Sequence, residues 1–184
     1  MHHSGLALVN IFSVLEAGHL HAGMTVADFG CGLTGHLTFS AAKIVGETGL
    51  IFAVDKNLAV GKTLTNRAQH LGLKQVQVVR GDFTVLQGSG LPNGTADVVF
   101  LLNVLSQVVP ENRPAVLFEA LRVLKPKGRL VIGDWQKNYL SFSPPAKMMV
   151  DWINLIKQAR LLGLAVPKKF SVGPHHAGVV FFRA

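Results

Sequence analysis

Short hydrophobic runs alternate along the chain with longer stretches in which hydrophobic residues recur at helical spacing. Five of the runs are nearly continuous and rich in valine, isoleucine and phenylalanine, which is typical of strands buried on both faces of a parallel sheet. These runs start at residues 24, 49, 76, 96 and 128 and read MTVADF, GLIFAVD, VQVVRGD, ADVVFLLN and GRLVIGDW. They predict five central strands.

Amphipathic helices are predicted between these strands. Each intervening stretch has the length and hydrophobic spacing of a helix, and the stretches cover residues 35–46, 57–71 and 111–124. The spacing of Leu8, Ile11, Phe12 and Leu15 predicts an opening helix over residues 6–17. Alternating strands and helices predict a doubly wound α/β sheet with right-handed crossovers.

The C-terminal part follows a different pattern. After a predicted helix near residues 146–162, the stretch KKFSVGPHHAGVVFFRA, which starts at Lys168, predicts a strand, a Gly-Pro turn and a second strand. The turn is so short that the two strands must be antiparallel. We therefore expect a seven-stranded sheet, mostly parallel, with a C-terminal antiparallel hairpin. No repeat or linker interrupts the chain, so residues 1–184 are predicted to form a single domain with its N-terminal helix in residues 1–20.

Cysteine usage and the N-terminal sequence indicate the compartment. Cys31 is the single cysteine, which excludes an internal disulfide and suits a reducing environment. Residues 1–23 have no lysine or arginine before their hydrophobic part, and Asn10 and Glu16 interrupt that part, so neither a signal peptide nor a membrane span is predicted. We expect a cytoplasmic protein.

Positive charge is concentrated in the last third of the chain. The formal net charge is +8, yet residues 1–120 hold seven Lys/Arg and eight Asp/Glu, a balance of −1. From Leu121 onward, eleven basic residues face only Asp134 and Asp151, a balance of +9. Such an excess could attract an anionic substrate, nucleic acid or a membrane surface, or it could simply form a solvated surface.

The stretch VADFGCGLTGHLT contains a candidate nucleotide-binding loop. Gly30, Gly32 and Gly35 match the G-x-G-x-x-G pattern of dinucleotide sites, which would place a pyrophosphate at the start of the next helix. Asp28 argues against a pyrophosphate, because at an effective dielectric of roughly 20 two unit charges about 4 Å apart interact by ~4 kcal/mol. That interaction would repel NAD but attract the ammonium or sulfonium of S-adenosylmethionine. The loop therefore favours S-adenosylmethionine.

Two further acids follow the next two predicted strands. Asp55 ends the run IFAVD and can accept hydrogen bonds from both hydroxyls of a ribose. Asp82 follows VVRG and can accept from an adenine amino group, while Phe83 next to it can pack on the ring. Each acid alone could be a turn or cap residue. Three acids after three successive parallel strands share the ligand-binding edge of the sheet and form a much more specific pattern.

These residues resemble the class I S-adenosylmethionine-dependent methyltransferases, and in particular the small-molecule group related to the ubiquinone/menaquinone C-methyltransferases. The match runs over roughly residues 24–184 and rests on VADFGCGLTG, AVDKN, RGDF, ADVVFLLNVLSQV and EALRVLKPKGRLVIGDW. The resemblance implies a Rossmann-like fold with S-adenosylmethionine as the cofactor. The implied cofactor-binding residues are Asp28, Phe29, Gly30, Cys31, Gly32, Gly35, Asp55, Lys56, Asp82, Phe83 and Asn103.

The resemblance also assigns roles within this set. Asp28, Gly30 and Gly32 would hold the methionine part, and Asn103 would lie near the cofactor beside the methyl-transfer site. The loop departs from the family because GLTG places Gly35 three residues after Gly32 instead of two. The contacts of residues 33–35 are therefore left open.

The sequence says less about the acceptor. Candidate bases are His19, His21, His36, Tyr139, His175 and His176, and none stands in a diagnostic pattern. The histidine pair in the hairpin turn is interpreted as a surface feature, and the histidine spacing predicts no metal site. Residues 134–147 form the only covering loop that the sequence predicts, which leaves a site to be completed by a large substrate, a second subunit as in a homodimer, or the N-terminal helix.

Three functions remain open from the sequence. The leading one is methyl transfer to a small molecule. The second is methylation of RNA or another nucleic acid, which the basic last third favours but LLNVLSQ does not, since it lacks the Asn/Asp-Pro-Pro-aromatic pattern that resembles amino-group methylation. The third is a non-catalytic S-adenosylmethionine-binding subunit.

Overall fold

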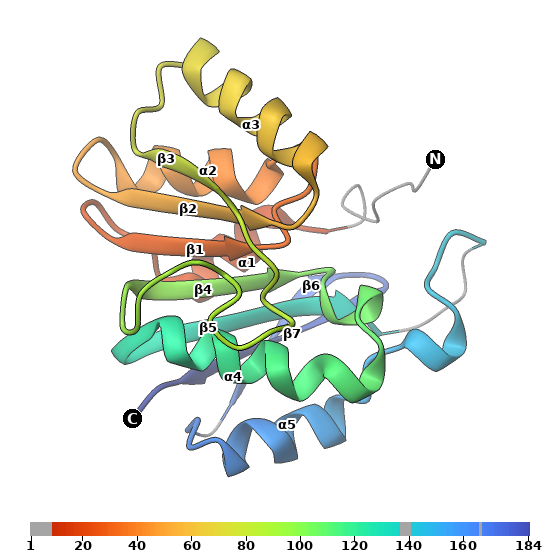
Figure 1. Cartoon of the computed structure of the whole chain (residues 1–184). Helices are drawn as coiled ribbons and strands as arrows, with labels where there is room; N and C mark the ends of the chain where they lie inside the picture. Colours follow the sequence, from red (N-terminus) through yellow and green to blue (C-terminus); the bar gives the residue numbers. More distant parts are fainter. Residues whose placement is uncertain (1–8, 137–140, 166) are drawn as a thin grey trace.

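The computed structural model describes residues 9–136, 141–165 and 167–184, which fold around one seven-stranded sheet (Figure 1). The strands lie in the order β3-β2-β1-β4-β5-β7-β6. Their bounds are β1 Thr25–Phe29, β2 Leu50–Asp55, β3 Val76–Arg80, β4 Ala96–Leu102, β5 Leu124–Trp135, β6 Lys168–Gly173 and β7 His176–Phe182. The helices are α1 Ile11–Gly18, α2 His36–Val45, α3 Leu58–His70, α4 Arg113–Val123 and α5 Trp152–Leu161, with short 3-10 turns η2 Leu105–Gln107, η3 Pro110–Asn112 and η4 Ala146–Met148.

The sheet confirms the predicted class and topology. Strands β3, β2, β1, β4 and β5 are parallel neighbours, and β7 runs antiparallel to both β5 and β6. The strand order reverses between β1 and β4. In doubly wound sheets this reversal opens a crevice at the carboxyl ends of the strands, where ligands bind.

Two hydrophobic cores hold the helices against the two faces of the sheet. Val26 of β1 belongs to the core that also contains buried residues of α1, α2 and α3. Ala27 and Phe29 belong to the other core, together with buried residues of α4 and α5. Because successive side chains of a strand point to opposite faces, the near-continuous hydrophobic runs fill both cores.

Three predicted element boundaries change. The opening helix begins at Ile11, after Asn10 as its N-cap. Phe12 is 79% exposed, so its side chain is not part of the buried face of this helix. Leu8 lies outside the described residues. The predicted helix at 146–162 is two elements, because Met149 takes an extended backbone and Asp151 caps a new helix, α5. Strand β5 begins at Leu124, earlier than residue 128, with an irregular register opposite β4.

The interpretation of the histidine pair as a surface feature is wrong for His176. It lies on β7 opposite Trp135 of β5, is 2% exposed, and its ring packs 4.4 Å from the indole, centroid to centroid. Burial lowers the pKa of His176 to about 4, so the ring is neutral. His175 precedes β7 and is partly exposed, whereas His176 is the first residue of β7 and is buried.

Candidate functional site

A cavity of about 690 Å³ lies at the carboxyl ends of β1, β4 and β5. Five of the predicted cofactor residues line it: Asp28, Gly30, Cys31, Gly32 and Asn103. Asp28 lies on β1, the glycines and Cys31 lie in the β1–α2 loop, and Asn103 directly follows β4, so the set spans the strand reversal. The crevice predicted from the strand pattern is therefore present, and it is partly open to solvent.

The first two glycines let the backbone turn sharply after β1. Gly30 and Gly32 have φ of 78° and 62°, values that side chains rarely allow. The N–H of Gly30 donates to the Val54 carbonyl over 2.8 Å, and a Cβ on Gly30 would lie 2.7 Å from Cγ2 of Val104. A Cβ on Gly32 would meet nothing closer than 4.0 Å, so the backbone there is open to the cavity.

The extra residue of the loop forms a separate turn. The N–H of Gly35 donates to the Gly32 carbonyl over 3.2 Å, and Arg67 of α3 donates to the Thr34 carbonyl over 2.6 Å. Gly35 has φ of 53° at the start of α2, where a Cβ would lie 2.8 Å from Cε2 of Phe39. Gly35 is thus required for packing between the loop and α2, and it is not among the residues that line the cavity.

Asp28 is a buried carboxyl group at the base of the cavity. Its Oδ2 accepts a hydrogen bond of 2.5 Å from the Thr38 hydroxyl in the first turn of α2. Burial raises the pKa of Asp28 to about 6, although hydrogen bonds from Thr38 partly offset this effect. A positively charged ligand group would favour the charged form and lower this pKa.

Asp55 is tied directly to the glycine loop. Its Oδ2 accepts from the Gly32 N–H over 3.2 Å, and its Oδ1 accepts from the Asn57 N–H over 2.9 Å. The carboxylate therefore lies beside the loop at the end of β2. Neighbouring Lys56 extends outward and forms an ion pair of 3.7 Å with Asp82.

Asp82 lies at the end of β3 on the same edge of the sheet. The Thr84 hydroxyl and N–H donate to its Oδ1 over 2.6 and 3.0 Å. These hydrogen bonds lower the pKa of Asp82, and the positive charge of nearby Lys56 lowers it further. Phe83 stacks on Phe29 with ring centroids 5.0 Å apart. Phe29 is completely buried, so its ring supports Phe83 from within the core.

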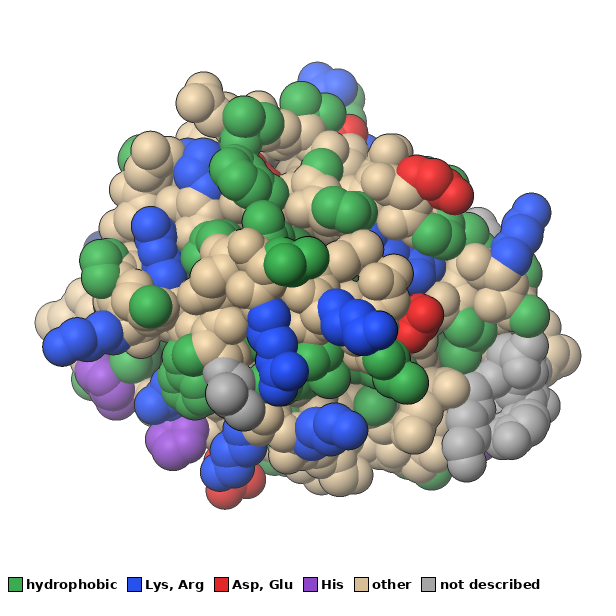
Figure 2. All heavy atoms as spheres, turned by 90° about the horizontal axis from the view of Figure 1, so that it is seen from below, with side chains coloured by type: hydrophobic (Ala, Val, Ile, Leu, Met, Phe, Trp, Pro, Cys, Tyr) green, Lys and Arg blue, Asp and Glu red, His purple; other side chains and the backbone are tan. Residues whose placement is uncertain are grey.

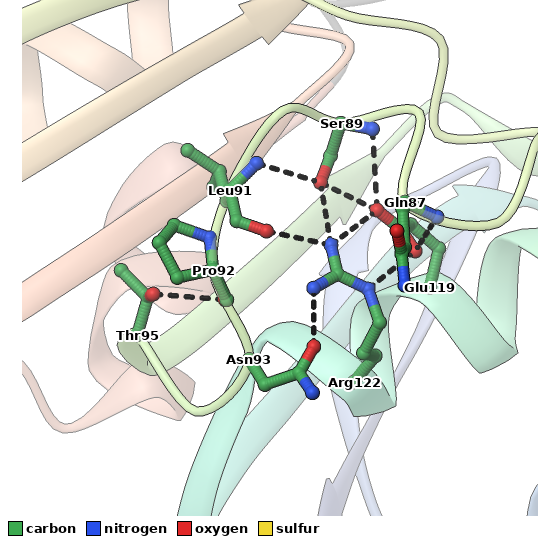
Figure 3. A network of polar contacts seen from close by, with 8 residues as sticks. All are labelled: Gln87, Ser89, Leu91, Pro92, Asn93, Thr95, Glu119 and Arg122. Carbon is green, nitrogen blue, oxygen red and sulfur yellow. Dashed lines mark hydrogen bonds and ion pairs between the residues drawn. The ribbon is translucent and has the colours of Figure 1, made fainter.

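A buried ion pair fixes the loop that follows Asp82 (Figure 3). Glu119 of α4 accepts hydrogen bonds from the N–H groups of Gln87 and Ser89, and Arg122 pairs with it at 2.7 Å. Burial by itself would raise the pKa of Glu119, but the bonds from Arg122, Ser89 and Gln87 lower it to about 2. The loop is thus anchored to α4.

Asn103 has an unusual environment at the end of β4. Its backbone is left-handed, with φ of 55°, and its carbonyl accepts from Gln107 Nε2 over 2.5 Å. Its side-chain nitrogen and oxygen are both buried, and neither has a hydrogen-bond partner among the described residues. Buried amides are normally hydrogen-bonded, so this amide is available to a polar group in the cavity.

Further residues line the cavity beside the predicted cofactor residues. Trp135, Phe142 and Pro145 belong to the covering loop predicted over 134–147. Ser106 and Gln107 of η2 and Met148 of η4 were not predicted from the sequence. No local pattern marks the other residues, because tertiary folding brings them together.

The candidate bases are scattered in the structure. His36 lines the cavity, whereas His19 lines a different pocket and His176 lies behind Trp135. The ring of His21 contacts the carbonyl of the next residue at 3.1 Å, and Tyr139 lies outside the described residues. In the described ranges, no three His, Cys, Asp or Glu side chains are grouped so as to hold a metal.

Comparison with known proteins identifies the family. Residues 20–166 match the model of a methyltransferase domain. A crystal structure of an S-adenosylmethionine-dependent methyltransferase from Aquifex aeolicus superposes with a TM-score of 0.84 and 28% identity, covering 99% of this chain and 94% of that one. The [4+2]-cyclase SpnF shares the fold at 17% identity, with a TM-score of 0.72 over 94% of this chain and 79% of its own.

Curated relatives point in the same direction. A ubiquinone/menaquinone biosynthesis C-methyltransferase, UbiE, from Hydrogenovibrio crunogenus is 31% identical over 125 residues, or 67% of this chain and 46% of the relative. The chain thus spans about half the length of the curated relatives it matches. The family match, the strand order and the glycine loop agree, and the chain belongs to the S-adenosylmethionine-dependent methyltransferases of class I.

Proposed function

We propose that this chain transfers a methyl group from S-adenosylmethionine to a small-molecule acceptor held in the cavity. The observation that carries the proposal is that one cavity of about 690 Å³ is lined both by the glycine loop and by an aromatic wall. Trp135 and Phe142 form that wall, with ring centroids 6.2 Å apart and rings edge to face.

The residues around the loop fit the cofactor. The space beside Gly32 lets a ligand approach the backbone closely, and the unpaired amide of Asn103 leaves polar groups available. The acids suit a cofactor without phosphates. Asp28 would attract the ammonium group, and Asp55 would accept from the ribose hydroxyls. Asp82 would accept from the adenine amino group. When bound, S-adenosylmethionine supplies an electrophilic methyl group on its sulfonium.

The remaining contribution of the protein is position and exclusion of water. The segment 141–148 covers the cavity, and the Asn103 amide would orient a polar atom of the bound molecules. The relatives named for ubiquinone and menaquinone biosynthesis support a small-molecule acceptor. His36 is the histidine that lines the cavity and would serve as the base where an acceptor must lose a proton.

Calorimetry of cofactor binding tests the ligand assignment. We expect S-adenosylmethionine and its demethylated product to bind and NAD not to bind. Asp55→Ala should weaken that affinity by at least about tenfold, because charge-assisted hydrogen bonds are worth roughly 1.5–3 kcal/mol. Glu47→Ala, which removes an exposed acid outside the cavity, is the matched control. Unchanged affinity in Asp55→Ala would refute the ribose assignment.

Methyl transfer itself is tested with labelled cofactor and fractionated cell extract. We expect the label to enter small metabolites. Label in RNA would replace the proposal with nucleic-acid methylation. Cofactor binding with no labelled product in any fraction would indicate a non-catalytic subunit.

A further inference from the structure

Helix α5 presents an exposed face that combines aliphatic and cationic side chains. Ile153 and Leu161 are 72% and 88% exposed, among the largest values for hydrophobic residues of the described chain. Exposed Lys157 and Arg160 lie between them, and the spacing i, i+4, i+7, i+8 places all four on one side of the helix. The opposite side, with Leu155, is buried in the core under the sheet.

The surroundings of this face are strongly cationic. The chain from residue 141 to 184 has six Lys/Arg and one acid, Asp151, whose carboxylate accepts from the N–H groups of Ile153 and Asn154 at the start of α5. Among the described residues the ion pairs use other cations, so Lys157 and Arg160 have no carboxylate within ion-pair distance. Seen from below, Lys and Arg side chains are spread over this side of the molecule with hydrophobic side chains between them (Figure 2).

Edge strand β6 adds to the same face. Phe170 and Val172 point into the core that contains α1, so Lys169, which alternates with them, points to the α5 side of the sheet. Lys147 of η4 lies near the start of α5, since both line one shallow pocket. The cationic face is therefore formed by residues 147, 157 and 160, with Ile153 and Leu161 as its aliphatic part, and Lys169 adds positive charge on the same side of the sheet.

The chemistry of this face selects its partner. A second copy of the chain would bring the same positive charge, and single-stranded nucleic acid is usually held by aromatic rings that stack on bases. The exposed side chains here are aliphatic. Aliphatic residues beside Lys and Arg on one helix are typical of helices that lie in the headgroup region of anionic bilayers. We propose that α5 docks this protein on an anionic lipid surface.

This docking would affect the neighbouring site. Segment 141–148 covers the cavity and leads through Met149 into α5. Binding of α5 to lipid would hold that segment next to the membrane surface. The docking itself does not depend on which acceptor the cavity takes. In the described parts of the chain no helix is long and apolar enough to cross a membrane, so the contact would be peripheral.

Vesicle co-sedimentation with the full chain tests the proposal. We expect binding to vesicles of phosphatidylcholine mixed with phosphatidylglycerol, weak binding to phosphatidylcholine alone, and loss of binding as salt is raised. Lys157→Glu/Arg160→Glu should weaken binding by at least about tenfold, since each cation near such a surface contributes roughly one kcal/mol. Ile153→Ser/Leu161→Ser should also weaken it. The control Lys62→Glu/Lys74→Glu makes the same change in net charge on exposed residues away from α5 and should bind nearly as well.

Three outcomes would overturn the proposal. The first is an equal loss of vesicle binding in the α5 and control charge reversals. The second is that the parent protein binds single-stranded RNA but no vesicles, and that the α5 variants lose the RNA binding. The third is a dimer in light scattering that the Ile153→Ser/Leu161→Ser variant abolishes. Cofactor affinity measured by calorimetry confirms that each variant is folded. Because the vesicle assay needs no methyl transfer, failure of the proposed function would leave its result unaffected.

Discussion

At the scale of single residues, Asp28 has two roles that pull in opposite directions. Its hydrogen bond to Thr38 anchors the start of α2, while its burial makes the charged form unfavourable. The same burial strengthens the attraction for a cation, because the local dielectric is low. The negative charge of Asp28 disfavours a dinucleotide, and the protonation of the same residue should control the binding of a cationic ligand.

We expect cofactor affinity to rise from about pH 5 to about pH 7. The pKa of Asp28 is raised to about 6, so below that pH the carboxyl is neutral and cannot attract an ammonium group. The free energy of unfolding of the cofactor-free protein should fall between about pH 4 and pH 6, because the unfolded chain releases the Asp28 proton at a lower pH than the folded one. Calorimetry across this range measures the affinity.

Asp28→Asn is the control for this prediction, because it keeps an acceptor for Thr38 and removes the charge. Its affinity should be low and nearly independent of pH. A pH dependence that persists unchanged in this variant would assign the effect to another group.

At the scale of elements, one arginine holds the end of segment 141–148 by hydrogen bonds. Arg113 at the start of α4 is buried, and its guanidinium donates to the carbonyls of Leu105 and Val108 and to those of Met148 and Met149. It thereby joins the exit of β4 to the segment that reaches the cavity through Met148. The planar, multiply donating group explains why a cation is buried among carbonyl groups.

Arg113→Ala should destabilise the fold by on the order of 3 kcal/mol, because several buried carbonyls lose their donor. Arg113→Lys should recover only part of this, since an ammonium cannot reach all four acceptors. Chemical denaturation measures the loss, and Arg80→Ala, at an exposed position on β3, is the control. Equal stability of Arg113→Ala and the parent protein would show that the hydrogen bonds of Arg113 do not contribute to the free energy of unfolding.

The elements themselves could be predicted largely from sequence, but the site only in part. The hydrophobic runs predict the five central strands because their side chains fill the cores on both faces of the sheet, and the Gly-Pro turn predicts the hairpin of β6 and β7. The acids near the ends of β1, β2 and β3 predict one edge of the site. Trp135, Phe142 and Met148 have no shared local pattern, and the inward orientation of His176 depends on the register between β5 and β7. Such residues are set by tertiary packing, which a single sequence does not display.

At the scale of the whole molecule, the fold limits the range of possible functions but does not identify the methyl acceptor. The same architecture occurs in a methyltransferase and in a [4+2]-cyclase, so function has to be argued from the cavity and its residues. The two cores lie on opposite faces of one sheet, and Leu124 and Phe181 of neighbouring strands are both fully buried. A single domain over residues 1–184 remains a prediction, which thermal unfolding tests.

We expect one cooperative unfolding transition that circular dichroism and intrinsic fluorescence report at the same temperature. Saturating S-adenosylmethionine should raise that temperature, since a ligand at about 100 times its Kd stabilises the folded state by roughly 2.7 kcal/mol. Two separated transitions would contradict the single-domain prediction. A transition unmoved by the cofactor would contradict the binding site.

The packing of Trp135 against His176 has a practical consequence. The chain has two tryptophans, and Trp135 lines the cavity whereas Trp152 does not. Because His176 has a pKa of about 4, it keeps the same neutral charge beside the indole at physiological pH. In a Trp152→Phe background, the emission of Trp135 would therefore serve as a built-in optical reporter of whichever small molecule enters the cavity.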